Sequence, residues 1–192
     1  MLVDRLLHGL ARRPALTARQ RSCLALSSMY SILNGRSDET LDGHSWWLRQ
    51  ESWEMLNGSW SIKGRTAAAK HERTLAVLDW LGGEGDRSDP QKCAAASERD
   101  LLAWDMARLV HVARSARHAR FLGESESWTY VLAAGSRLAS ALRGWDDFAR
   151  SFLRGRMAWA GAADAKVEGA VERLLAEPKS TWNRRAWKDL AP

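Results

Sequence analysis

The sequence predicts an all-α protein: a single compact, orthogonal or bundle-like helical domain of about seven to nine helices with no significant sheet. Of its 192 residues, 30 are Ala and 25 are Leu, whereas Val, Ile and Thr together number only 15. Ala and Leu enter helices at little cost in free energy, and the β-branched residues that favour strands are scarce. The 11 Trp residues supply large apolar surfaces that disordered chains lack. We therefore expect one folded helical core.

Three helices are expected in the first half of the chain, because apolar residues there recur three and four positions apart. They cover about residues 17–33, 45–56 and 65–81. Thr17 has the side chain of an N-cap, and the Asn-Gly pair at 34–35 ends the first helix. The polar stretch 82–96, which begins with two glycines, predicts a long exposed loop.

The second half of the chain contains the longest expected helix and three others. They cover about residues 98–121, 125–143 and 146–159 and a last segment that ends near residue 177. Ser97, followed by Asp100, resembles a capping box, and Ser125 is the expected N-cap of the next helix. Gly155 lies in mid-helix, where glycine costs about 1 kcal/mol relative to Ala. We therefore expect that two helices cross closely at Gly155.

The chain is expected to form one domain over residues 1–192, with a loose segment at 1–16 and a short C-terminal tail at 178–192. Charged residues interrupt the apolar N-terminus, unlike a signal peptide, and no run of 18 apolar residues is long enough to span a membrane. Cys23 and Cys93 form no metal-binding motif and are expected to be small buried thiols. These features predict a cytoplasmic protein with no membrane span, no metal and no cofactor.

A polar stripe on the longest helix is the first candidate site. Asp105 and Arg108 are three residues apart and share a helix face, and His111 follows one turn later. With Arg156 from a neighbouring helix, these residues are candidates for proton transfer or anion binding in an enzyme pocket. The competing interpretation is a partly buried ion pair between Asp105 and Arg108 that orients the helices, with His111 at the surface.

The same helix carries the densest positive charge of a chain whose formal net charge is +6. Arg114, Arg117 and Arg120 lie on one face, with no acidic residue between Met106 and Gly123. A solvated helix face explains such a row, and nucleic-acid binding is the functional alternative. No metal site is expected, because His111 and His118 are seven residues apart, about 10 Å along a helix.

Several aromatic and polar blocks resemble a bacterial family known as domain of unknown function 1266. They are Trp60-Ser-Ile62, Leu78-Asp-Trp-Leu81, Gly85-Asp-Arg87, Trp104-Asp-Met-Ala-Arg108, Leu122-Gly-Glu-Ser-Glu-Ser-Trp128, and Trp145, Phe148, Phe152, Gly155, Arg156 and Trp159. The resemblance covers about residues 46–160 and implies a bacterial, mostly helical, cytosolic protein, without implying an activity. Family members commonly carry a histidine where this chain has Asp86. Asp105, Arg108 and Arg156 are the polar matches that the resemblance implies as site groups.

Protein binding without catalysis is the leading functional hypothesis from the sequence. No catalytic motif is present, whereas abundant Trp is typical of anchors at protein interfaces. Trp46, Trp47 and Trp53, beside several acidic residues, are the candidate partner-binding residues. An immunity-type or adaptor protein would fit this pattern. The enzyme pocket and the Arg114, Arg117 and Arg120 face remain the two alternatives.

Overall fold

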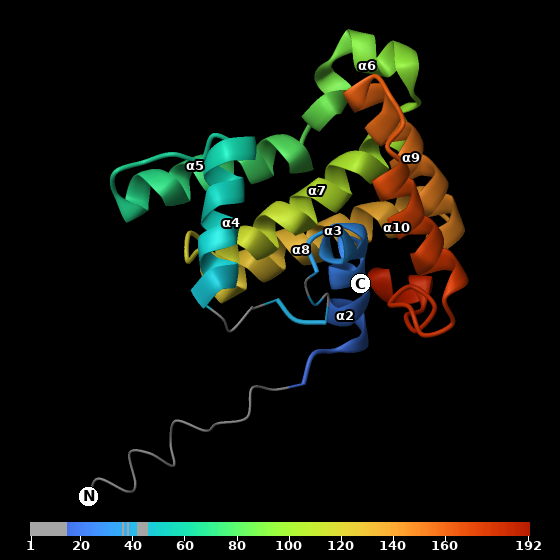
Figure 1. Cartoon of the computed structure of the whole chain (residues 1–192), viewed down its shortest axis with the longest axis horizontal. Helices are drawn as coiled ribbons and strands as arrows, with labels where there is room; N and C mark the ends of the chain where they lie inside the picture. Colours follow the sequence, from blue (N-terminus) through green and yellow to red (C-terminus); the bar gives the residue numbers. More distant parts are fainter. Residues whose placement is uncertain (1–14, 36, 38, 42–45) are drawn as a thin grey trace, which may run out of the picture.

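The fold is a set of helices arranged around one long central helix (Figure 1). The computed structural model describes residues 15–35, 37, 39–41 and 46–192, and the side chains of 46–48 lie outside this description. Within these ranges the structure contains nine α-helices and no strand, which confirms the all-α prediction. The helices are α2 (Ala18–Ala25), α3 (Ser28–Leu33), α4 (Trp46–Ser59), α5 (Ala67–Gly82), α6 (Pro90–Ala95), α7 (Glu98–His118), α8 (Glu124–Ala141), α9 (Trp145–Ala160) and α10 (Ala165–Ala176).

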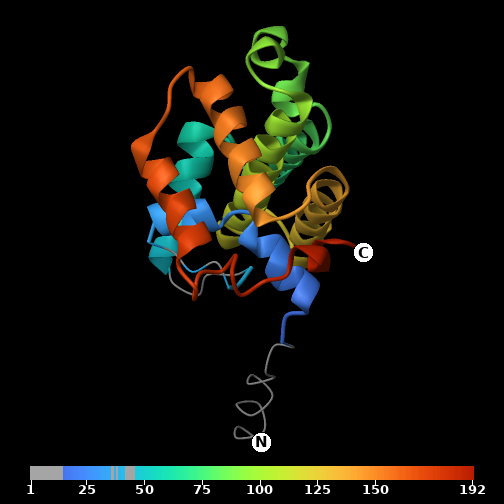
Figure 2. The same cartoon turned by 90° about the vertical axis from the view of Figure 1, so that its right-hand side faces the viewer.

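Helix α7 forms the centre of the molecule and is packed against α9, α8, α4 and α5. Figures 1 and 2 show it running between these neighbours. Of its 21 residues, 15 are buried, so this helix has no fully solvated face. Four of the buried residues are charged and therefore need partners inside the protein. They are Asp100, Asp105, Arg108 and Arg114.

The expected close crossing at Gly155 is confirmed. A Cβ atom on Gly155 would lie 2.2 Å from the main-chain oxygen of Asp100, so α9 meets the first turn of α7 at backbone distance. A second close contact joins α2 and α8, where a Cβ on Gly135 would lie 2.3 Å from Cys23 Sγ. At two positions of the core, the absence of a side chain on glycine therefore allows two helices to come into close contact.

Three expectations about helix bounds and cysteine burial are wrong, and side-chain hydrogen bonds explain two of them. The expected helix at 17–33 is broken between α2 and α3, where the Ser27 hydroxyl is buried and donates to the Leu24 oxygen at 3.1 Å. Helix α8 begins after Gly123 rather than Ser125, because Glu126 reaches back and accepts from the Gly123 amide at 2.8 Å. Cys93 is exposed, whereas Cys23 is buried as expected.

The stretch 82–96 is not a long exposed loop. It contains a 3₁₀ helix at Gly85–Ser88, followed by α6. Asp89 caps α6 by accepting from the Gln91 amide at 2.9 Å, and Pro90 occupies the first helical position. Gly85 and Asp86 are buried against α7, so this stretch brings a carboxylate into the interior.

The C-terminal segment packs into the core. Trp182 is 1% exposed, and its indole nitrogen donates to the Ala25 oxygen at 2.8 Å. Its ring stacks on Trp145 with centroids 5.4 Å apart. The expected loose segment at 1–16 falls outside the described residues except for its last two positions. No helix in the described part of the chain is long and apolar enough to cross a membrane.

Candidate functional site

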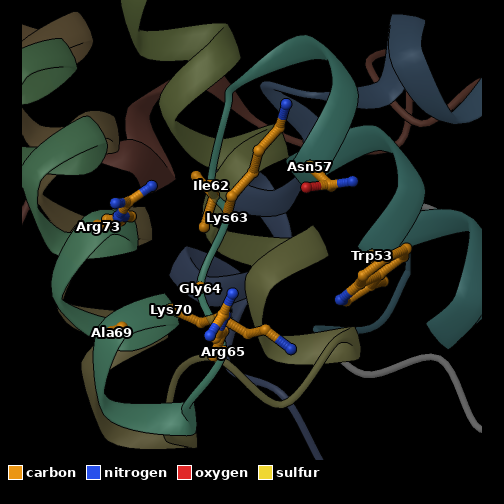
Figure 3. Close-up of a pocket in the computed structure, with 9 residues that line it drawn as sticks. All are labelled: Trp53, Asn57, Ile62, Lys63, Gly64, Arg65, Ala69, Lys70 and Arg73. Atoms are coloured by element: carbon orange, nitrogen blue, oxygen red, sulfur yellow. The ribbon is translucent and has the colours of Figure 1, made fainter.

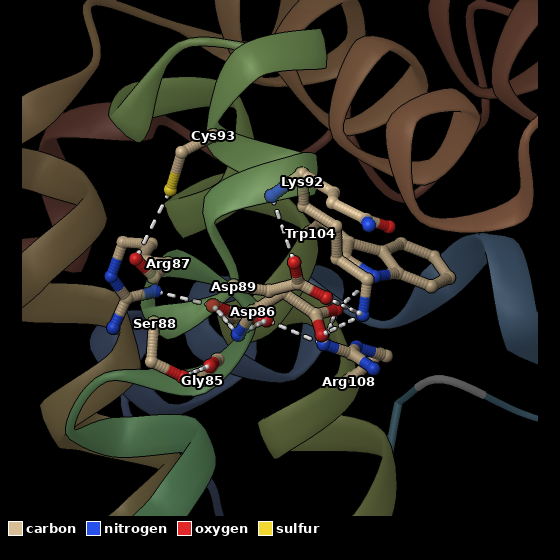
Figure 4. A network of polar contacts seen from close by, with 11 residues as sticks. Gly85, Asp86, Arg87, Ser88, Asp89, Lys92, Cys93, Trp104 and Arg108 are labelled. Atoms are coloured by element: carbon tan, nitrogen blue, oxygen red, sulfur yellow. Dashed lines mark hydrogen bonds and ion pairs between the residues drawn. The ribbon is translucent and has the colours of Figure 1, made fainter.

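A buried ionic network surrounds Arg108 in the middle of α7 (Figure 4). Arg108 Nη2 donates to Asp86 Oδ2 and to Asp105 Oδ1, each at 2.5 Å. Asp105 is 0% exposed, Asp86 is 2% exposed and Arg108 is 6% exposed. The ion pair between Asp105 and Arg108 that the sequence suggested is therefore present and almost wholly buried, and a second carboxylate joins it.

Gly85 brings that second carboxylate to the network. Its φ of +53° lies in the left-handed region, and a Cβ there would lie 2.2 Å from Asp105 Oδ2. The chain can therefore approach closely enough for the Asp86 amide to donate to Asp105 Oδ2 at 3.1 Å. Glycine is required at this position for both conformation and space.

Two further cations and one indole complete the network. Arg87 Nη1 donates to Asp105 Oδ2 at 2.5 Å, and Lys92 Nζ lies 2.7 Å from Asp86 Oδ1. Trp104 Nε1 donates to Asp86 Oδ2 at 3.2 Å. Lys92 Nζ also lies 3.6 Å from Asp89 Oδ2, so three cations meet three carboxylates and the formal charges of the cluster cancel.

The pKa values in this network follow from burial. Burial raises the pKa of the Asp105 carboxyl above its ordinary value, and the charges of Arg108 and Arg87 oppose that shift. Burial likewise lowers the pKa of Arg87, although Asp105 opposes it. Because Asp105 has no exposed surface and its oxygens are occupied, it cannot contact a substrate directly in this conformation. The network is suited to fixing Arg108 and the stretch 85–92 on α7.

Four tryptophan rings surround the Arg108 guanidinium. The guanidinium carbon lies 4.7 Å from the Trp104 ring centroid, 5.5 Å from Trp60, 5.7 Å from Trp80 and 5.9 Å from Trp159. These distances are typical of cation–π interactions. Trp80 is 42% exposed and Trp159 is 47% exposed. Two large apolar side chains that reach the surface therefore lie close to the buried Arg108 guanidinium.

A cavity of about 230 Å³ opens beside Arg108. It is lined by Tyr30, Met55, Ser59, Trp60, Trp104, Arg108, His111 and Trp159. The His111 ring stacks on Tyr30 with centroids 4.5 Å apart. Burial raises the pKa of Tyr30, and its hydroxyl finds no hydrogen-bond partner among the described residues. This space is large enough for one side chain or a small ligand and offers aromatic walls with one cation.

The structure brings together only part of the predicted enzyme pocket. Arg108 and His111 line the same cavity, whereas Asp105 lies outside it. Arg156 lines a different cavity and donates to Asp164 Oδ2 at 2.6 Å. The expectation that Arg156 joins the stripe of Asp105, Arg108 and His111 in one pocket is therefore wrong in this structure, because Asp164 takes up its guanidinium.

The prediction of a cationic face on α7 is also wrong for Arg114, the first of its three arginines. Arg114 is 5% exposed and donates to Ser27 Oγ at 3.0 Å and to the Ser37 oxygen at 2.7 Å, so it joins α7 to the N-terminal region. Arg117 is partly buried with Glu124 3.9 Å away, and Arg120 is exposed. A continuous exposed row of three arginines is therefore not formed.

Of the predicted partner-binding tryptophans, Trp53 can be placed. It is partly buried and packs against the core from α4, with Lys70 Nζ 5.8 Å from its ring centroid. The side chains of Trp46 and Trp47 lie outside the described residues. No group of three or more potential metal ligands occurs in the described ranges.

The residues around Arg108 that residue-by-residue reasoning missed are Asp86, Trp60, Trp80 and Trp159. They come from four separate segments, so no periodicity in the sequence connects them. Trp60, Trp80 and Trp159 belong to the blocks that carry the family resemblance, whereas Asp86 stands at a position where this chain departs from the family pattern.

These features define a class of protein: an all-helical domain whose central helix carries a buried ionic network surrounded by tryptophan. Residues 61–187, about two thirds of the chain, match the family model described as "Protein of unknown function (DUF1266)". The chain belongs to this family. The match begins later and extends further toward the C-terminus than the resemblance at 46–160. Neither a curated protein nor a solved structure matches the chain significantly.

Proposed function

We propose that this protein is a non-enzymatic, cytoplasmic bacterial interaction domain, of immunity or adaptor type, that binds one specific protein partner. The observation that carries the proposal is the exposure of Trp80 and Trp159, whose ring centroids lie 5.7 Å and 5.9 Å from the Arg108 guanidinium carbon. We call these three residues, with the partly buried Trp60, the tryptophan face. Trp and Arg are the residues most enriched among those that dominate binding energy at protein interfaces.

The arrangement of the tryptophan face supports binding rather than catalysis. Its cation is held by two buried carboxylates, so the surface around it is preorganised and loses little entropy on binding. The adjoining cavity of about 230 Å³ can receive one anchoring side chain of a partner. An acidic or aromatic anchor would complement the Arg108 guanidinium and the indole walls.

The enzymatic alternative retains one observation in its favour, which is that Arg108 and His111 line the same cavity. Its expected acid, Asp105, is sealed between two arginines and a backbone amide. A reaction at this cavity would therefore need His111 or Tyr30, which also line it, in place of Asp105. Binding at the tryptophan face requires no catalytic acid, and we therefore place protein binding first.

The test is affinity capture of the tagged protein from the lysate of its own host, compared with three variants. We expect wild type to retain one partner at about equimolar amount, and Trp80→Ala and Trp159→Ala each to weaken its affinity by about 30-fold, the effect of a 2 kcal/mol interface residue. Leu33→Ala is the control, since Leu33 is 40% exposed on α3, outside the tryptophan face. Equal retention by both Trp variants, or no stoichiometric partner, would refute the proposal.

A further inference from the structure

A second surface, at the junction of α4 and α5, concentrates positive charge without compensation. Its five cationic side chains are Arg49, Lys63, Arg65, Lys70 and Arg73. None of them forms an ion pair or a side-chain hydrogen bond within the described part of the chain. This differs from the Arg108 network, where every cation meets a carboxylate. An uncompensated cluster of cations is electrostatically prepared for an anionic ligand.

The five cations line two adjoining hollows. Each has a volume of about 500 Å³, and Trp53 and Lys70 contribute to both. No carboxylate lines either one. Figure 3 shows Arg73 on the α5 side and Trp53 on the α4 side of the first hollow, with Lys63 and Arg65 extending from the segment between the two helices. We call the two hollows together the basic groove.

Local structure holds these cations in place. Ile62 is 0% exposed, and its amide donates to the Leu56 oxygen at 3.0 Å, which anchors the segment between α4 and α5. Lys63 and Arg65, which follow Ile62 in the same segment, are exposed. Lys70 Nζ lies 5.8 Å from the Trp53 centroid and 5.5 Å from the Phe121 centroid. The groove is therefore built on packed elements and not on a loose loop.

We propose that the basic groove binds a short single strand of nucleic acid. Phosphate groups of the backbone match Lys and Arg side chains that have no carboxylate partner, and Trp53 adds an aromatic wall against which a base can stack. An acidic polypeptide would use the cations but would leave the aromatic wall without a specific role. Two hollows joined at Trp53 and Lys70 give room for more than one nucleotide.

The groove is separate from the tryptophan face. Trp60 lines the cavity beside Arg108, whereas Ile62 and Lys63, a few residues further on, line the groove. The segment between α4 and α5 thus contributes to both surfaces. Loss of partner capture and loss of nucleic-acid binding can be produced by different variants, so the failure of one proposal is distinguishable from the failure of the other.

Fluorescence anisotropy with fluorescein-labelled dT12 and rU12 tests the proposal between 50 and 200 mM salt. We expect wild-type binding to weaken with salt, with a slope of about −0.7 per phosphate contacted. The double variant Lys63→Gln/Arg73→Gln should weaken binding about tenfold or more at the lower salt and make the slope shallower by about 1.4, since two contacts are lost. Trp53→Leu should weaken binding at least about fivefold through lost stacking.

The matched control is Arg137→Gln/Arg150→Gln, which removes the same charge from exposed positions on α8 and α9. It should stay within about twofold of wild type. The proposal is overturned if neither oligonucleotide binds at 50 mM salt, or if the control weakens binding as much as the groove variant. It is also overturned if polyglutamate of similar charge competes as well as the strand does, or if AMP binds as tightly as the oligonucleotides.

Discussion

Gly155 of α9 lies directly against the main chain of Asp100 in α7: a Cβ on Gly155 would lie 2.2 Å from the Asp100 oxygen and 2.8 Å from Trp104 Cβ. The two helices therefore touch through their backbones at this point. The contact lies four residues before Trp159, whose ring is 5.4 Å from the Trp104 centroid. The crossing thus places Trp159 beside Arg108, and the shape of the tryptophan face depends on it.

Gly155→Ala should destabilise the protein by about 1–3 kcal/mol or more, because a methyl group would collide with backbone that cannot rotate away. Denaturation with urea measures the change. The matched control is Gly169→Ala in α10, another helical glycine, where a Cβ would meet nothing within 4 Å. That control should stabilise the protein by about 0.5–1 kcal/mol, since Ala is the better helix former. Equal effects of the two substitutions would show that α7 and α9 are not in backbone contact.

Asp105→Asn should lower the free energy of unfolding by about 3–5 kcal/mol, because removing one partner leaves buried cations uncompensated. The measurement is a urea or thermal unfolding curve. As a control, Glu177→Gln breaks the exposed pair between Arg173 and Glu177 on the surface, and its effect should stay below about 1 kcal/mol. A variant at position 105 that is as stable as wild type would mean that the network does not hold the fold together.

The two thiols should differ sharply in reactivity. Burial raises the pKa of Cys23 to about 12, although the charge of Arg19 opposes this, whereas Cys93 is exposed. At pH 8 a thiol reagent should label one cysteine quickly in the folded protein and the second only in denaturant. Cys93→Ser should remove the fast reaction. Rapid labelling of both thiols would contradict the packing of Cys23 against Gly135.

The raised pKa of Cys23 also makes the stability of the protein depend on pH. Because the folded protein holds the Cys23 proton more tightly than the unfolded chain, the contribution is fully present below pH 9 and is lost as the pH rises from 9 toward 12. Unfolding curves measured across this range should therefore show declining stability at alkaline pH.

Helix positions were predictable because they depend on local chemistry. Thr17 and Ser97 act as N-caps as expected, and the interruption by Gly155 marked a real crossing. The failures occurred where distant residues decide the outcome. The stretch 82–96 has the composition of a loop, yet Gly85 and Asp86 are buried, because Arg108 of α7 donates to the Asp86 carboxylate and Asp105 of α7 accepts from the Asp86 amide.

The candidate site was half predictable for the same reason. The spacing of Asp105 and Arg108 predicted their contact, since neighbours one helical turn apart meet without help from the rest of the fold. Nothing local could show that Arg156 would bind Asp164, or that Arg114 would be buried by the segment that carries Ser27 and Ser37. Contacts between side chains of different segments depend on how the helices are packed. That packing is determined by the whole sequence together and not by any local pattern.

Asp100 provides a test at acidic pH. Burial alone would raise its pKa, but hydrogen bonds from Arg154 and Ser97 outweigh burial and lower the pKa below the ordinary 3.8. A lowered pKa means that the ionised carboxylate stabilises the fold above pH 3.8 and that this contribution is lost as the pH falls through the folded-state pKa. Asp100→Asn should therefore be less stable than wild type at pH 7, by about 1.5–3 kcal/mol for hydrogen bonds to a charged group.

The difference between wild type and Asp100→Asn should shrink as the pH is lowered from 4 toward 2, since wild type then loses the same charge that the variant lacks. Urea midpoints measured at several pH values follow this change. Asp146→Asn is the control, because Asp146 is an exposed carboxylate at the start of α9. If the stability of Asp100→Asn fell with acid in parallel with wild type, the carboxylate at position 100 would not couple the first turn of α7 to Arg154 of α9.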